Sequence, residues 1–187
     1  MIFSYGFLEK ERTEAKQLLL DLDIPDDDPL KVPKKVYCEE TPAIQIDAPT
    51  SEGTRWDSPL VWWACVNEED GLDFKLEQTT DGKKELRATW REEYLEKPRD
   101  LRFRLATDPL WDVIHLRAIV LILERLESQL LALRATEKAV SEIRREEEED
   151  MLQATFRPGM FHMVSQLQEI EGELLEVIIE EFALLVG

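Results

Sequence analysis

The chain has 187 residues, enough for one domain with a substantial buried core. It carries 41 acidic and 23 basic side chains, for a formal charge of −18. This charge repels nucleic acids and anionic membranes, so we expect neither as a partner. The two cysteines, Cys38 and Cys65, lack the spacing of metal ligands and indicate a reduced protein of the cytoplasm or nucleus. The apolar run Ala118 to Leu123 is too short to cross a bilayer.

An apolar, aromatic segment, Ile2 to Leu8, opens the chain and would be costly to leave in water. The following segment, Glu9 to Leu20, is predicted to form a short amphipathic helix with Ala15 and two leucines on its apolar face. The acidic run Asp26 to Asp28 lacks the glycine and the distal glutamate of a calcium loop. It is therefore predicted to be a solvated loop.

Prolines interrupt residues 31–49 and limit their regular structure. The apolar residues of this stretch are predicted to form short extended pieces rather than the core of a sheet. These residues are Val32, Val36, Ala43, Ile44 and Ile46. Residues 23–56 are therefore expected to be a connector.

A helix start signal follows at residue 57. Asp57 or Ser58 can cap a helix, and Pro59 suits the first helical position, because its missing N–H would have no partner there. A short helix is predicted from Leu60 to Val66, anchored by its tryptophans.

Residues 74–90 contain a strong hairpin signal. Asp81-Gly82 lies between two partly alternating segments, 74–78 and 85–90, which are predicted to pair as antiparallel strands. After this hairpin, Glu92 to Arg104 is predicted to be helical, with an interruption at Pro98.

Two long apolar stripes occupy the C-terminal half. From Pro109 to about Ile143, apolar residues recur at spacings of three, four and seven, which predicts one long helix. A second stripe runs from Met160 to Phe182, after a break at Arg157-Pro158-Gly159. We expect two long antiparallel helices packed side by side. The predicted fold class is mainly α, with shorter helices and a small β-hairpin.

The opening motif, Phe3-Ser4-Tyr5-Gly6-Phe7-Leu8-Glu9, resembles the end of the SET domain in protein-lysine methyltransferases of the Rubisco large-subunit and ribosomal-protein type. Residues 57–72 look like the segment that follows the SET domain in fungal members, and the long helices look like their C-terminal substrate-binding domain. By this resemblance, residues 1–22 are the end of a truncated SET domain, 23–56 a connector and 57–187 a helical domain similar to the substrate-binding one.

The resemblance implies that Tyr5 and Phe7 line the channel that admits the substrate lysine beside S-adenosylmethionine. Aromatic walls suit this role because they hold an ammonium group by cation–π contact. An aromatic cluster in a core at a domain seam is the alternative for both residues. The family's glycine-rich cofactor segment, Asn-His pair and principal catalytic tyrosine do not occur in the sequence. We therefore expect the chain alone neither to bind S-adenosylmethionine nor to methylate.

Both histidines, His115 and His162, are expected to be core or rim residues, because neither has ligand partners at metal-site spacing. The last helix is predicted to carry an acidic outer face, which includes Glu173 and Glu176. A lysine-rich partner, such as a ribosomal or histone-like protein, would be attracted to this face, although a solubilising surface explains it equally well.

Three functional hypotheses follow from the sequence. The first is the substrate-recognition portion of a SET-domain protein-lysine methyltransferase. The second is a non-enzymatic helical module that binds another protein. The third is a coiled-coil assembly element, which the small number of clean heptads disfavours. The oligomeric state is not determined by the sequence.

Overall fold

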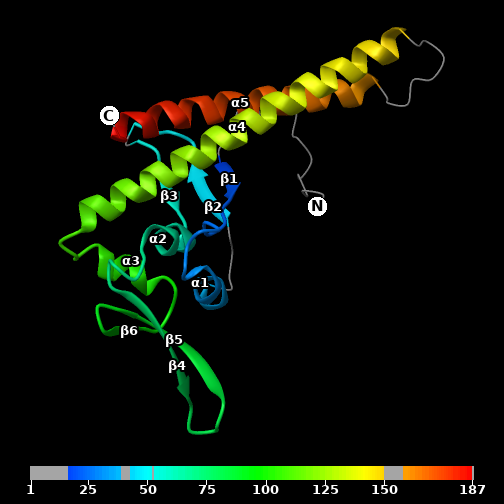
Figure 1. Cartoon of the computed structure of the whole chain (residues 1–187). Helices are drawn as coiled ribbons and strands as arrows, with labels where there is room; N and C mark the ends of the chain where they lie inside the picture. The colour runs from blue at the N-terminus through cyan, green and yellow to red at the C-terminus, as the bar shows by residue number, and fades with distance from the viewer. Residues whose placement is uncertain (1–16, 39–42, 52, 150–157, 187) are drawn as a thin grey trace.

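The computed structural model describes residues 17–38, 43–51, 53–149 and 158–186. These residues form five helices and two three-stranded antiparallel sheets (Figure 1). Helices and strands both contribute buried residues to the core. The fold is therefore mixed α/β rather than the mainly α fold predicted from the sequence. The predicted hairpin and the short helix predicted from Leu60 to Val66 are present within it.

The first sheet joins segments that are distant in the sequence. Its middle strand, β2 (Ala43–Asp47), pairs with β1 (Gln17–Asp21) on one side and with β3 (Trp56–Asp57) on the other. Apolar side chains alternate between buried and exposed along β1, as a strand with one covered face requires. The fully covered side chains are Leu18, Leu20, Ile44 and Ile46.

This sheet corrects two predictions. The predicted helix Glu9 to Leu20 ends in a strand, because Leu18 and Leu20 face the core while Leu19 is 61% exposed. Residues 9–16 lie outside the described part. Ala43, Ile44 and Ile46 belong to β2, the middle strand of the sheet, rather than to isolated extended pieces.

Helix α1 (Lys31–Tyr37) also replaces a predicted extended piece. Pro33 lies in the first turn of this helix, where backbone N–H groups have no intrahelical partner and proline is tolerated. The helix turns Lys34 towards the core, where its side chain is completely buried.

Helix α2 (Pro59–Cys65) confirms the predicted start signal. The Ser58 side chain accepts a hydrogen bond from Val61 N at 3.4 Å, and Pro59 occupies the first turn. Five of the seven helical residues are buried, so α2 lies at the centre of the core. These residues are Leu60, Val61, Trp62, Trp63 and Cys65.

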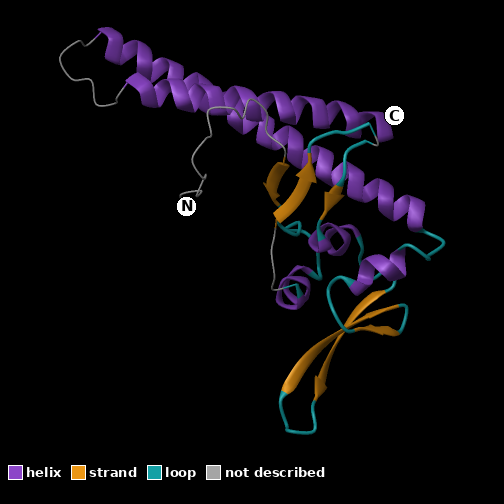
Figure 2. Cartoon of the chain, turned by 180° about the vertical axis from the view of Figure 1, so that it is seen from behind, coloured by secondary structure: helices purple, strands orange, loops and turns teal. Residues whose placement is uncertain are grey.

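The second sheet contains the predicted hairpin. Strands β4 (Leu72–Gln78) and β5 (Lys84–Trp90) pair in antiparallel register, and Gly82 adopts φ +81° in the connecting turn. The hairpin projects from the body at the end opposite the long helices (Figure 2). It is extended by a third strand, β6 (Glu93–Leu95), which pairs with β5.

Strand β6 occupies part of the segment that was predicted to be helical from Glu92 to Arg104. Arg91 and Glu92 adopt φ values of +48° and +72°, so the chain reverses directly after β5 and pairs back onto it. Only Asp100–Leu105, helix α3, confirms the helical prediction.

The two longest elements are α4 (Trp111–Glu149) and α5 (Pro158–Val186). They lie side by side in both views, and α5 returns from the far end of α4 towards the first sheet (Figures 1 and 2). Arg134 and Glu176 form an ion pair between them at 2.6 Å. None of the helices in the described part is long and apolar enough to cross a membrane.

Burial divides these two helices into two parts. Near the sheets, both helices contribute side chains that are at most 3% exposed: Ile114, Ala118, Ile119, Ile122, Leu126, Leu175, Ile178 and Phe182. After Leu126, no described side chain of α4 is fully buried. We call residues 127–142 of α4 and 163–174 of α5 the distal part; it extends beyond the body of the molecule (Figure 1).

Candidate functional site

Tyr5 and Phe7, the residues assigned to a substrate-lysine channel by resemblance, lie outside the described residues. The structure therefore leaves that assignment as it stood.

His115 lies in a row of stacked rings. Its imidazole stacks on Trp111 at 5.1 Å between centroids, and Trp111 stacks on Trp62 at 5.3 Å. Trp56 also stacks on Trp62, at 5.1 Å between centroids. The half-buried imidazole thus packs against aromatic faces, as expected of a rim histidine. The row ties β3, α2 and α4 together.

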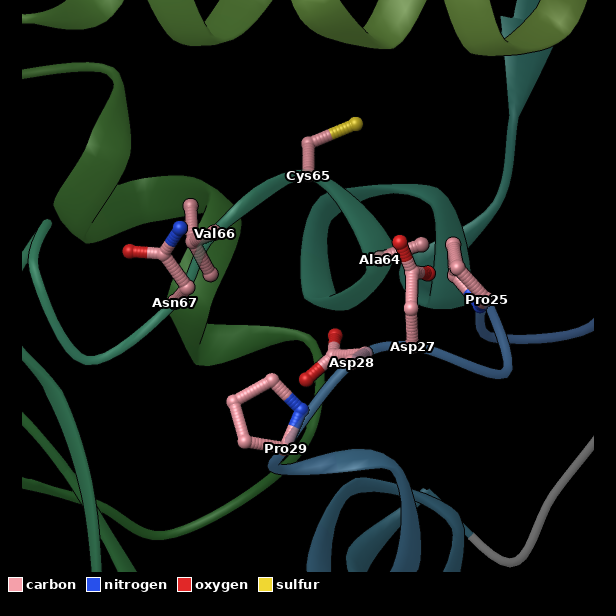
Figure 3. Close-up of a pocket in the computed structure, with 8 residues that line it drawn as sticks. All are labelled: Pro25, Asp27, Asp28, Pro29, Ala64, Cys65, Val66 and Asn67. Atoms are coloured by element: carbon pink, nitrogen blue, oxygen red, sulfur yellow. The ribbon is translucent and has the colours of Figure 1, made fainter.

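A pocket of about 240 Å³ lies between the β1–α1 loop and the end of α2 (Figure 3). Pro25, Asp27, Asp28 and Pro29 form one wall, and residues 64–67 form the other. The Cys65 sulfur points away from Asp27 and Asp28 (Figure 3). The pocket therefore does not bring a thiol and a carboxylate together as a nucleophile and base would require.

A buried ion pair lies beside this pocket. Lys34 Nζ contacts Asp28 Oδ2 at 2.5 Å and donates a hydrogen bond to the Val66 carbonyl oxygen at 2.6 Å. The Lys34 side chain is fully buried, and that of Asp28 is 10% exposed. Asp28 is thus not part of a solvated loop as predicted, whereas Asp26, with its side chain 99% exposed, is.

Lys34 and Asp28 join the β1–α1 loop to the end of α2. The ammonium group has two acceptors, and the other Asp28 oxygen accepts from Leu30 N at 2.8 Å. Both charges are therefore paired and hydrogen-bonded, as expected of an ion pair with a structural role. A second ion pair of this kind joins Arg117 of α4 to the buried Asp70 carboxylate at 2.8 Å.

The cysteine thiols are unsuited to nucleophilic chemistry. Burial raises the pKa of Cys65 to about 12, against a smaller opposing effect of Arg117. Burial also raises the pKa of Cys38 to about 12. Both thiols therefore remain protonated near neutral pH. The thiolate is the reactive form, so neither side chain is a nucleophile under these conditions.

A groove of about 190 Å³ lies between the two long helices, largely within the distal part. It is lined by Leu130, Leu133, Arg134 and Glu137 of α4 and by Gln168, Glu169, Gly172, Glu173 and Glu176 of α5. Four glutamates and one arginine leave this lining with a net charge of −3 at neutral pH. We call this feature the α4–α5 groove.

The acidity of α5 was predictable from the sequence, whereas the groove was not. Gly172 is the signal that could have indicated it, because a glycine inside a strong helical pattern often marks a close approach. A side-chain carbon added there would lie 3.6 Å from Leu133 Cδ2. Gln168 gave no signal, since its position relative to α4 depends on how the two helices pack.

Among the described residues, no group of three or more histidine, cysteine or acidic side chains is arranged to hold a metal ion. No protein-family model, curated protein or solved structure matches the chain. Functional proposals therefore rest on its own residues and geometry.

Proposed function

We propose that the chain is a protein-binding module in which α4 and α5 act as one antiparallel pair that recognises a basic segment of another protein. The observation that carries this proposal is the α4–α5 groove, an apolar floor between helices with a rim of net charge −3. Such a surface attracts a basic chain by its field and offers it apolar contact.

Two further features support a protein as the partner. The distal part exposes large apolar side chains, with Leu131 72% and Met163 53% exposed. It also extends beyond the sheets, so a partner can reach both of its helices (Figure 1). Apolar surface beside charge favours a peptide over a simple counterion.

A titration with a labelled oligolysine peptide tests this function, read by fluorescence anisotropy. We expect saturable binding at about 0.01 M ionic strength and an association constant lower by about ten-fold or more at about 0.15 M. An oligoglutamate peptide of equal length is the control and should not bind. Absence of oligolysine binding at the lower ionic strength would remove the proposal.

Variants separate recognition by the helices from a general effect of charge. Neutralising Glu169, Glu173 and Glu180 of α5 to glutamine should weaken oligolysine binding. The control replaces Glu68, Glu69 and Glu92, which lie outside both long helices, and changes the charge by the same amount. Equal losses in the two variants would indicate a surface that only solubilises the protein.

A second candidate function is the substrate-recognition portion of a SET-domain protein-lysine methyltransferase of the cytoplasm or nucleus. It is supported by the resemblance of residues 3–9 and of 57–72, the latter forming α2 and the turn after it. The basic segment would then be the substrate, a ribosomal or histone-like protein.

This second candidate requires S-adenosylmethionine, which we expect the chain alone not to bind. The test joins the chain to the cofactor-binding portion of a SET domain and measures transfer of labelled methyl groups to basic ribosomal proteins. Transfer that is lost in Tyr5→Ala would support the candidate. A fusion that binds the cofactor but transfers no methyl group would refute it.

A further inference from the structure

The α4–α5 groove is smaller than a typical small-molecule site. Its volume is about 190 Å³, below the roughly 300–1,000 Å³ of pockets that bind whole ligands. The groove therefore has room for one side chain of a partner rather than for a cofactor.

The floor of the groove suits an aliphatic stem. Leu130 and Leu133 line one side, and Gly172 presents bare backbone opposite Leu133. Lysine and arginine bury their methylene stems against such apolar surface while their charged ends remain near polar groups.

Negative charge is available at the rim. The one cation of the lining, Arg134, is engaged with Glu176 at 2.6 Å. The side chains of Glu137, Glu169 and Glu173 make no hydrogen bond or ion pair within the part of the chain that the structure describes. Three carboxylates can therefore accept from an incoming cationic group.

Gln168 gives an independent indication of a ligand. It is only 9% exposed, it lines the groove, and its carboxamide forms no hydrogen bond to any described residue. The polar atoms of this carboxamide are not fully buried, so they are open to the groove that the residue lines. Its oxygen can accept from a donor that enters the groove.

We infer that the α4–α5 groove binds one lysine or arginine side chain of the basic partner. The stem lies on Leu130, Leu133 and Gly172, and the charged end donates to the Gln168 carboxamide and to the carboxylates of Glu169 and Glu173. This inference rests on the proposed function and specifies the contact through which it works.

The first test compares variants that differ only in where charge is removed. Glu169→Gln/Glu173→Gln should weaken oligolysine binding by about five-fold more than Glu124→Gln/Glu127→Gln. The control pair lies on the exposed surface of α4 outside the groove and removes the same charge.

The second test uses Gln168→Leu, which keeps the side-chain volume and removes the amide. A purely structural Gln168 predicts equal or higher stability and unchanged binding. The inferred role predicts equal or higher stability together with oligolysine binding weakened by about three-fold or more.

Gly172→Ala should also keep the fold, since its added methyl group would lie 3.6 Å from Leu133 Cδ2. It should weaken oligolysine binding, because the methyl group narrows the floor of the groove.

The third test locates the contact by nuclear magnetic resonance. A glycine-serine peptide with a single lysine should shift the Gly172 amide and the Gln168 side-chain amide saturably, and the same peptide with norleucine should not. Oligolysine binding that is unchanged in all groove variants, or equal shifts with norleucine, would overturn the groove assignment alone. Failure of oligolysine to bind the wild-type chain would overturn the proposed function as well.

Discussion

Replacing Lys34 by an apolar residue should cost substantial stability. It is fully buried, and it neutralises Asp28 and satisfies the Val66 carbonyl oxygen. Lys34→Met keeps an apolar stem but leaves a buried carboxylate and a carbonyl group without their donor. We expect the free energy of unfolding in urea to fall by about 3–5 kcal/mol.

The matched control for Lys34→Met adds Asp28→Asn. Asparagine can still accept from Leu30 N, the hydrogen bond that Asp28 makes with its other oxygen, and it carries no charge to bury. The double variant should therefore recover part of the lost stability. A loss of less than about 1 kcal/mol in Lys34→Met would mean that the pair behaves like an exposed one.

The buried Cys65 thiol should make the free energy of unfolding depend on pH in the alkaline range. Burial raises the pKa of its thiol from 9.0 to about 12, so the folded state favours the protonated form more than the unfolded state does. This contribution is fully present below about pH 9 and is lost as pH rises towards about 12. Burial raises the pKa of Tyr37 and of Cys38 in the same direction.

Urea unfolding across this alkaline range provides the measurement. The wild-type chain should lose stability as pH rises, and Cys65→Ala should lose less, because its buried thiol no longer titrates. Each variant is compared with its own stability at neutral pH, which removes the effect of the smaller side chain. Identical pH dependence in both proteins would contradict a protonated, buried Cys65 thiol.

At the level of elements, the sequence predicted structure where the signal is local. Ser58 and Pro59 start α2, and Asp81-Gly82 closes the β4–β5 hairpin, because each signal acts within a few residues of the element it specifies. The long apolar stripes likewise predicted α4 and α5, because the helical spacing of their apolar residues repeats over many turns.

The first sheet was missed because its signals are not local. Three consecutive leucines at 18–20 fit a strand or a helix, and β1 becomes a strand only by pairing with β2. The prolines of residues 31–49 predict interruptions, but none lies within Ala43–Asp47, so none removes a ladder hydrogen bond of β2. The groove was missed for a similar reason, since its lining depends on the register between two helices.

Helix α4 should show a gradient of hydrogen exchange along its length. Residues 114–126 include side chains that are completely buried in the body, where α4 packs on α2 and β1, whereas residues 131–142 include no buried side chain and belong to the part of α4 that extends beyond the body. Local opening is easier where fewer apolar contacts are broken.

Mass spectrometry of peptides from the two segments measures this gradient. We expect backbone amides in 131–142 to exchange about ten-fold or more faster than those in 114–126. The segment 175–182 of α5 is the internal control and should be protected like 114–126, because it packs on the same body. Equal protection along α4 would show that the helical pair is stabilised by itself.

For the whole molecule, the formal charge of −18 makes self-repulsion the dominant electrostatic term. Most ion pairs among the described residues are solvent-exposed, as Lys83–Asp81 is, and such pairs contribute little. Screening should therefore weaken repulsion more than it weakens attraction.

We expect added sodium chloride to raise the unfolding temperature by about 2–4 °C as the Debye length falls from about 30 Å to about 10 Å. The variant with Glu169, Glu173 and Glu180 changed to glutamine carries less repulsion, so its increase should be smaller. An unfolding temperature that falls with salt would mean that favourable pairs outweigh the excess negative charge.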